Sequence, residues 1–367
     1  MIPEHRPTRL PVFLASALSK LYSVGINHKN SQYDRGIGVR SIDRPVISIG
    51  NLSAGGTGKT PLVQHIVRHL SERGHYPVVA MRGYKAKHGA MSDEQREHAQ
   101  ALPGVPIVAQ PDRFAGLEEL FGSDAGKQVD CVVLDDGFQH RKLARDLDVV
   151  VIDVSRAPEF DALLPLGFLR EERASLARAD CVVLTHAELI DQDELGELRS
   201  DIETWIQRGV LIAVTEHHWE SVHKYEVTEE GLVQHPEALS VEVLSELPVS
   251  TLTGIGNPDG FVNMAKKIGA EIVHRCDRPD HEQFATKLIQ DFCSASERNG
   301  ARAILMTRKD WARFDSPKIR TILEREMRDR GLRLLVPSLG LCFRSGRSDL
   351  DALCLKCISS FSTTAQI

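Results

Sequence analysis

A strand-like apolar run that leads into a glycine-rich turn constrains this chain more than any other feature. The segment from Val46 to Pro61 reads VISIGNLSAGGTGKTP, and helical apolar spacing follows it. Such a turn cradles phosphate groups, because glycine lets them approach the backbone N–H groups and the helix start attracts anions. Lys59 can reach the outer phosphates, and the Thr60 hydroxyl can bind Mg²⁺. The residues expected around the phosphates are Gly55, Gly56, Thr57, Gly58, Lys59 and Thr60.

A second strand-like run ends in two carboxylates, Asp135 and Asp136, after the apolar sequence CVVL. In P-loop proteins a strand beside the phosphate loop ends in an Asp that holds Mg²⁺ directly or through water. Carboxylate oxygens are hard ligands, which suit Mg²⁺. We therefore expect both residues on the metal side of the nucleotide, and which of them touches the metal stays open.

Short apolar strands alternate with helical stretches, which favours a mostly parallel sheet covered by helices. The expected strands are 46–50, 77–81, 106–109, 131–135, 148–153, 181–185 and 210–214, with helices over about 112–121 and 190–207. A second strand–helix series begins at Val249 and includes a helix over 317–330. The prediction is an α/β fold, with a P-loop NTPase-like, mostly parallel sheet that carries helices on both faces, and a second, smaller α/β domain.

The length of 367 residues favours two domains over a single compact core. We expect an amphipathic N-terminal helix over 1–30, a P-loop domain over 31–215, a hairpin linker over 216–246, a second α/β domain over 247–345 and an unpatterned tail over 346–367. The seven cysteines are scattered, which favours a reducing compartment. Cys354 and Cys357 have the spacing of half a zinc site, but no second pair lies nearby.

Charge is distributed unevenly along the chain. The formal net charge of −6 and the pI near 6.2 argue against nucleic-acid binding. Residues 1–45 nevertheless carry seven basic and three acidic residues. Between Val12 and Gly25 the apolar residues fall on one helical face and the serines and Lys20 on the other. This helix could lie in a membrane interface or pack on its own domain, and the pattern alone leaves both open. No run approaches the roughly 20 apolar residues of a membrane span.

Several stretches together resemble the tetraacyldisaccharide 4'-kinase family, the lipid A 4'-kinases. They are Gly50-Asn51 with GGTGKTP up to Pro61, Arg82-Gly-Tyr84, Ser92-Asp-Glu94, LDDGFQH ending at His140, LPLGFLRE ending at Glu171, TGIGNP ending at Pro258 and Pro279-Asp-His281. They stand in the family's order over roughly residues 10 to 340. Ser53 replaces the first glycine of the strict G-x-x-x-x-G-K-[ST] pattern, which the family also lacks. Lys85, Ser92, Gln95 and Arg308 depart from the family's usual residues.

The resemblance implies ATP and Mg²⁺ as cofactors. It also implies that Asp93 is the general base, that Glu94 is a metal-side ligand and that His281 partners the base, which requires the two domains to face each other. In isolation Asp93 and Glu94 look like a solvated pair, and Asp280-His281 like a helix N-cap. Arg170 carries over as a phosphate or substrate contact, and His140 could touch phosphate or metal.

The expected function is transfer of the ATP γ-phosphate to the 4'-hydroxyl of lipid A disaccharide 1-phosphate, which gives lipid IVA. We expect a monomer at the cytoplasmic face of an inner membrane, held peripherally or monotopically by its N-terminal helix. The alternatives are a cytosolic P-loop kinase of small metabolites and a non-catalytic nucleotide switch. A GTPase would need Asn/Thr-Lys-x-Asp, and in the stretch that begins at Thr307 the lysine is displaced by one position.

Overall fold

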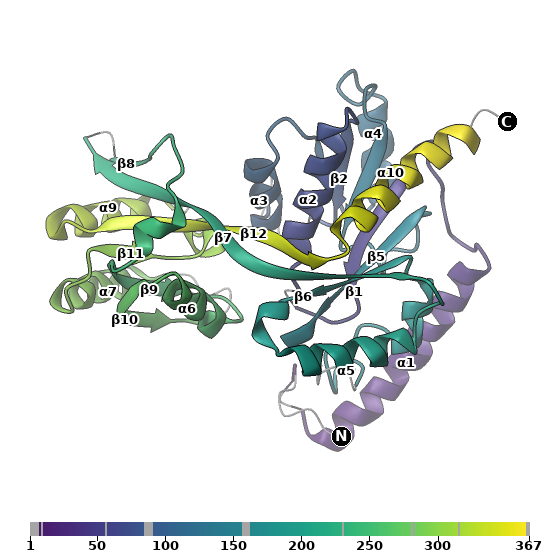
Figure 1. Cartoon of the computed structure of the whole chain (residues 1–367), viewed down its shortest axis with the longest axis horizontal. Coiled ribbons are helices and arrows are strands. Elements are labelled where there is room, and N and C mark those ends of the chain that lie inside the picture. Colours follow the sequence, from purple (N-terminus) through teal and green to yellow (C-terminus); the bar gives the residue numbers. More distant parts are fainter. Residues whose placement is uncertain are drawn as a thin grey trace. The chain divides into compact units, whose positions relative to one another are not determined.

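The computed structural model describes residues 7–8, 10–55, 57–83, 91–155, 162–229, 231–279, 282, 284–314 and 316–364, with the backbone alone for Asp93 and 362–364. It divides the chain into two compact units (Figure 1). Unit 1 comprises Met1–His217 and Leu341–Ile367, and unit 2 comprises His218–Gly340.

Unit 1 is built on a parallel sheet with the strand order β7-β6-β5-β1-β4-β2-β3. The strands are β1 (Val46–Asn51), β2 (Pro77–Met81), β3 (Ile107–Ala109), β4 (Cys131–Asp135), β5 (Leu147–Asp153), β6 (Cys181–Thr185) and the start of β7 (Leu211–Thr228). The expected strands are all confirmed. Because β1 lies between β4 and β5, the glycine-rich turn leaves from the centre of the sheet, next to the acidic end of β4.

Helices cover both faces of this sheet, as expected. Alternate residues of β1 point to opposite faces, so Ile47 and Ile49 pack with α2 (Lys59–Glu72) and Val46 packs on the opposite face with α4 (Arg113–Phe121). The remaining helices are α1 (Val12–Asp34), α3 (Asp93–Ala101), η2 (Arg173–Arg178), η3 (Ala187–Leu189), α5 (Gln192–Glu203) and α10 (Arg347–Thr364).

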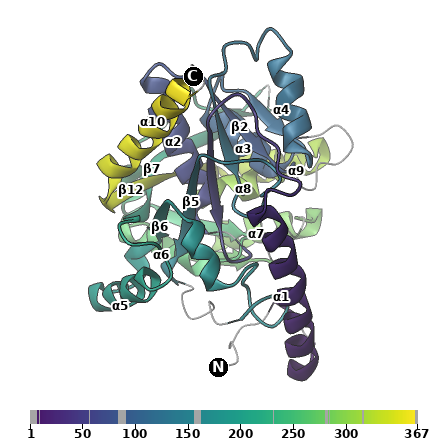
Figure 2. The same ribbon diagram turned by 90° about the vertical axis from the view of Figure 1, so that its right-hand side faces the viewer.

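The prediction of an unpatterned tail after residue 345 is wrong. The segment forms α10, which lies beside α2 (Figures 1 and 2). Leu350, Cys354 and Ile358 are at most 4% exposed and belong to the same core cluster as the apolar face of α2. Their spacing of four residues makes one helical stripe. Asp351 lies 2.9 Å from Nε2 of His65 in α2, which fixes the helix further.

Unit 2 has a smaller parallel sheet, in the order β10-β9-β11-β12. Its elements are β9 (Pro248–Thr253), α6 (Pro258–Lys267), β10 (Glu271–Asp277), α7 (Thr286–Arg298), β11 (Ala303–Leu305), α8 (Arg308–Trp311), α9 (Pro317–Arg330) and β12 (Arg333–Ser345). The helix expected over 317–330 is confirmed, and Gly331 ends it with a positive φ of 63°.

The segment expected to be a hairpin linker belongs to unit 2. The hairpin itself is present, because β8 (Gly231–Gln234) pairs antiparallel with the end of β7. η4 (Val241–Leu244) follows it. Trp219, Val222 and Leu244 are buried in a core cluster with residues of β9 and α6. A linker would not supply core side chains, so this unit begins close to residue 218.

Candidate functional site

The glycine-rich turn between β1 and α2 is held in place by side chains and by a second loop. Nδ2 of Asn51 donates to the Ser53 carbonyl at 2.7 Å and to the Thr57 hydroxyl at 2.9 Å. The Thr185 hydroxyl, at the end of β6, donates to the Thr57 carbonyl at 2.9 Å. The backbone N–H of Ala54 donates to the Phe168 carbonyl at 2.7 Å. These contacts hold Ala54 and Thr57 of the turn in position.

Gly58 needs to be glycine for two separate reasons. Its φ of 78° is a left-handed conformation that other residues rarely adopt. A Cβ there would also lie 2.6 Å from Cε1 of His217. The next residues, Lys59 and Thr60, begin α2, and no side chain among the described residues caps that helix. An uncapped helix start offers its backbone N–H groups to an anion.

Two cations converge on Asp136, immediately after β4. Nη1 of Arg170 lies 2.9 Å from each carboxylate oxygen, and Nζ of Lys59 lies 3.6 Å from Oδ1. Asp136 has a φ of 51°, a left-handed conformation in which the extended strand does not continue. Burial raises the pKa of this carboxyl, but the charges of Lys59 and Arg170 outweigh burial and hold it below its usual value. Lys59, Arg170 and Asp136, three of the expected site residues, thus meet at the start of α2.

Asp135 faces a different partner, which the sequence did not indicate. Nε2 of His98 in α3 lies 3.0 Å from Oδ2 of Asp135, and both side chains are buried, at 0% and 7% exposed. Burial opposes the charged imidazole, but the hydrogen bond and charge of Asp135 outweigh it and raise the pKa of His98. His98 stands outside every motif of the sequence, and only the packing of α3 brings it to β4.

Arg113 and His140 complete the described side of the site. Arg113 is 2% exposed, and its Nη1 donates to the Asp136 carbonyl at 3.1 Å. No sequence motif contains this arginine. His140 was selected, and burial together with the charge of Arg113 lowers its pKa to about 4. His140 is therefore neutral near pH 7, which suits a hydrogen-bonding role better than a charge-neutralising one.

Three of the expected site residues are not fully described. Gly56 and His281 lie outside the described residues, and only the backbone of Asp93 is described, as the first residue of α3. Glu94 follows in the first turn of that helix and is exposed. The structure therefore does not test the roles expected for Asp93, Glu94 and His281.

The donor set near β4 fits Mg²⁺ bound with a nucleotide. Thr60, Asp135 and Asp136 supply oxygen donors from the first turn of α2 and the end of β4. Among the described residues no group of three or more His, Cys, Asp or Glu forms a metal site, and this includes Cys354 and Cys357. Mg²⁺ typically takes one or two protein carboxylates and completes its shell with phosphates and water, so a sparse set is what this ion requires.

The loop that carries Arg170 is anchored to α1 by polar contacts. The Ser19 hydroxyl donates to the Leu163 carbonyl at 3.0 Å, and the Tyr22 hydroxyl donates to the Arg170 carbonyl at 3.0 Å. Nδ2 of Asn30 donates to Glu171, a carboxylate that is 1% exposed, at 2.7 Å. The polar face of α1 is thus the face that packs on unit 1, where the helix lies along one side (Figure 2).

The apolar face of α1 is left in contact with water. Phe13 is 77% exposed, Leu21 is 70% exposed and Val24 is 68% exposed. Ordinary packing of an amphipathic helix would bury these residues and expose the serines. None of the helices in the described part of the chain has the length and apolarity to cross a membrane.

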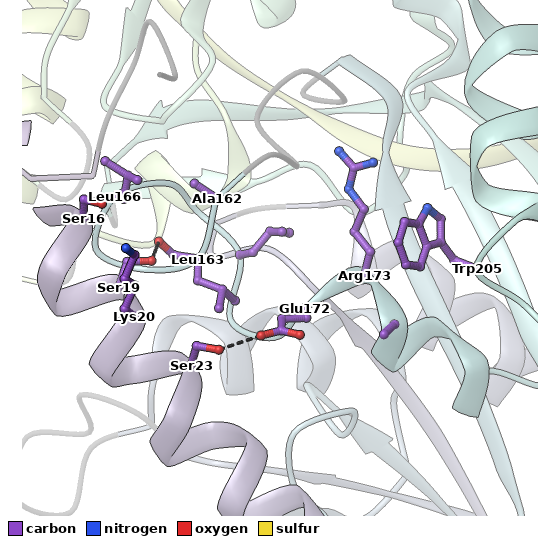
Figure 3. A pocket seen from close by; sticks show the side chains of 12 residues that line it. Ser16, Ser19, Lys20, Ser23, Ala162, Leu163, Leu166, Glu172, Arg173 and Trp205 are labelled. Atoms are coloured by element: carbon purple, nitrogen blue, oxygen red, sulfur yellow. Dashed lines mark hydrogen bonds between the residues drawn. The ribbon is translucent and has the colours of Figure 1, made fainter. Parts of the chain in front are cut away.

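A cavity of about 540 Å³ lies between α1 and the loop that follows residue 161. Ser16, Ser19, Lys20 and Ser23 line it from the helix, opposite leucines of the loop, with Arg173 and Trp205 farther along (Figure 3). Leu163 and Leu169 give it an apolar wall. Because Arg170 follows Leu169 directly, one loop links this cavity to the carboxylate of Asp136.

Comparisons with known proteins agree on one family. The family model described as tetraacyldisaccharide-1-P 4'-kinase matches residues 12–328. A tetraacyldisaccharide 4'-kinase of Anaeromyxobacter dehalogenans (strain 2CP-1) is 35% identical over 308 residues, which are 78% of this chain and 77% of the relative. One from Chlorobaculum parvum is 31% identical and covers 86% of this chain and 88% of its own. The solved structure of LpxK from Aquifex aeolicus in complex with ATP is 25% identical, with a TM-score of 0.66, and covers 93% of this chain and 98% of its own.

Proposed function

This chain belongs to the tetraacyldisaccharide-1-P 4'-kinase family, and we propose that it transfers the γ-phosphate of ATP to the 4'-hydroxyl of tetraacyldisaccharide 1-phosphate, giving lipid IVA. The observation that carries the proposal is the convergence of Lys59 and Arg170 on Asp136, beside the uncapped start of α2. That arrangement supplies two cations and a set of backbone donors for a polyphosphate.

Phosphoryl transfer requires positioning and neutralisation of charge more than covalent chemistry by the protein. Lys59 and Arg170 are held at one point by Asp136, so they are already oriented for the phosphate oxygens. Arg170 presents a planar fork that matches phosphate geometry, while Lys59 acts as a point charge. Mg²⁺, held by Thr60 and the carboxylates of Asp135 and Asp136, would neutralise charge on the β- and γ-phosphates.

The remaining roles rest on the family resemblance. We infer that Asp93 accepts the proton of the 4'-hydroxyl, that His281 orients this carboxylate, and that Glu94 stands on the metal side. In support, Asp93 and Glu94 occupy the first turn of α3, the helix that His98 ties to Asp135. A positioned carboxylate base contributes about 10²–10⁴-fold to rate in typical enzymes.

The lipid is proposed to approach from the side of α1. Exposed Phe13, Leu21 and Val24 supply an apolar surface that can enter a membrane interface, and the N-terminal region carries an excess of basic residues. The cavity beside Lys20 offers leucines next to the loop that holds Arg170. These features support a peripheral or monotopic enzyme at the cytoplasmic face of the inner membrane, where its lipid substrate would be anchored.

The proposed reaction is tested directly with labelled ATP and lipid A disaccharide 1-phosphate, followed by chromatography of the lipid. Label in a product with one additional phosphate at the 4' position supports it. Incubation with water-soluble sugars and nucleosides under the same conditions tests the small-metabolite alternative. Transfer to those acceptors but not to the lipid would overturn the proposal.

A further inference from the structure

His98 is the buried partner of Asp135, and nothing in the family motifs accounts for it. We propose that His98 is a positioning residue for the phosphoryl-transfer reaction. Its side chain orients the carboxylate of Asp135 and holds the first turn of α3 close to the end of β4. This inference rests on the proposed function, because it assigns Asp135 to the metal–nucleotide complex. His98 itself is not expected to touch nucleotide or lipid.

The first argument is the isolation of the pair from water. His98 is 0% exposed, Asp135 is 7% exposed, and the joining distance of 3.0 Å between Nε2 and Oδ2 is that of a hydrogen bond. Nδ1 of the same ring has no hydrogen-bond partner among the described residues. A buried carboxylate without a partner would be strongly disfavoured, so this contact stabilises the observed direction of the Asp135 side chain.

The second argument is the place of His98 along α3. Asp93 and Glu94 form the first turn of the helix, and His98 lies one turn after Glu94. The Ser92 hydroxyl accepts the N–H of Gln95 at 3.2 Å, which fixes where the helix starts. A helix rises about 1.5 Å per residue, so the first turn of α3 lies only about one helical turn from His98. The hydrogen bond between His98 and Asp135 therefore also keeps that first turn close to Asp135. One bond therefore aligns two parts of the proposed site.

A similar histidine–carboxylate pair at the opposite end of the same strand provides a control. Asp130 stands just before β4, and its Oδ2 lies 2.8 Å from Nδ1 of His75. The chemistry is the same, but those side chains are 39% and 28% exposed, and the start of β4 lies at the opposite edge of the sheet from the phosphate loop. His75 therefore serves as a control for the loss of a histidine–carboxylate pair that leaves the site untouched.

The test compares three single variants of the full-length protein. His98→Leu fills the space but removes the donor, whereas His98→Gln keeps an amide N–H at a reach similar to Nε2. Outer-shell partners of metal sites typically contribute 10–100-fold to metal affinity or activity, and we expect His98→Leu to lower kcat and to raise the Mg²⁺ requirement on that scale. His98→Gln should recover most of both, and His75→Leu should leave both at the wild-type level.

Two further measurements separate positioning from a purely structural role. Binding of Mn²⁺ with ADP, followed by electron paramagnetic resonance without lipid, should weaken in His98→Leu and return in His98→Gln. In an Asp135→Asn background, His98→Leu should add little further loss, because residues that act as one unit are not additive. Should the leucine variant fail to fold, His98→Asn gives the same comparison, since its shorter amide does not reach Asp135.

The proposal is overturned if His98→Leu is less stable to heat but keeps wild-type kcat, Mg²⁺ requirement and Mn²⁺ binding. Full multiplicative losses in the double variant would also overturn it, because the two residues would then act separately. A wild-type protein that binds Mn²⁺ and ADP but does not phosphorylate the lipid would instead count against the proposed reaction and leave the Mn²⁺ comparison of the variants valid.

Discussion

Arg170 places its Nη1 atom 2.9 Å from both carboxylate oxygens of Asp136, and Lys59 approaches the same carboxylate at 3.6 Å. Both cations therefore lie at the N-terminal end of α2. Replacing Lys59 with Ala removes a charge that the phosphates require, while the backbone of the turn is held by Asn51 and Thr185. We expect turnover to fall by about 10²–10³-fold or more without loss of folding, the scale for losing one preorganised electrostatic contact.

Steady-state kinetics and circular dichroism on the Lys59→Ala protein check this prediction. A second variant, Arg170→Lys, retains the charge but loses the planar fork and should also lose activity. Near wild-type turnover in Lys59→Ala would mean that the phosphates bind elsewhere.

Asp93 and His281 are proposed to act as a single base. Asp93→Ala and His281→Ala should each lower kcat by about 10²–10⁴-fold, the contribution of positioned proton transfer. The double variant should be little worse than the worse single variant. Rapid-mix kinetics on the three proteins measures this, and losses that multiply would separate the two residues.

The outward apolar face of α1 should bind membranes. A triple variant with Ser in place of Phe13, Leu21 and Val24 should bind anionic phospholipid vesicles about 10-fold more weakly, or weaker still, in a flotation assay. Each large apolar side chain contributes about 1.5–3 kcal/mol when fully buried. Tyr76 is also exposed, at 55%, and is the control site for a Ser substitution. Unchanged flotation of the triple variant would assign membrane binding, if any, to another surface.

Protonation of His140 should lower the free energy of unfolding of the protein in mild acid. Its pKa is 6.5 in the unfolded reference and about 4 in the folded protein, so the unfolded chain binds more protons between these values. Stability from the neutral imidazole is therefore complete above about pH 6.5 and is lost as the pH falls toward 4. The difference in free energy of unfolding between wild type and His140→Asn, measured by urea titration, should shrink through this window and stay flat above it. A difference that is constant down to pH 4 would show that the site does not hold the ring neutral.

The core position of Leu350 predicts a large stability effect near the C-terminal end of the sequence. Leu350→Ala should destabilise unit 1 by about 2–5 kcal/mol, the usual result for a buried leucine. Lys356→Ala, on the exposed side of α10, should change stability by about 0.5 kcal/mol or less. Differential scanning calorimetry on both proteins gives the comparison, and equal unfolding temperatures would mean that α10 is not part of the cooperative unit.

The phosphate loop and the acidic end of β4 could be predicted because each is a motif of consecutive residues. The pairing of His98 with Asp135 could not, since it joins positions 37 residues apart and depends on how α3 packs. Arg113 was missed because an arginine at a helix start usually lies in water, whereas here α4 buries it against Asp136. The stripe of Leu350, Cys354 and Ile358 was present in the sequence, but Leu353, Leu355 and Cys357 between its members are also apolar, so no single helical face stands out.

The discontinuity of unit 1 has a consequence for how the protein is made. A ribosome synthesises Met1–His217, then all of unit 2, and only then the segment from Leu341 onward that contains α10. Throughout that interval the face of α2 that will receive Leu350, Cys354 and Ile358 stays open to water and to chaperones. The phosphate loop is therefore synthesised early, whereas α10, which packs on α2, is synthesised last. Products of interrupted translation that lack this segment would leave these apolar side chains of α2 uncovered.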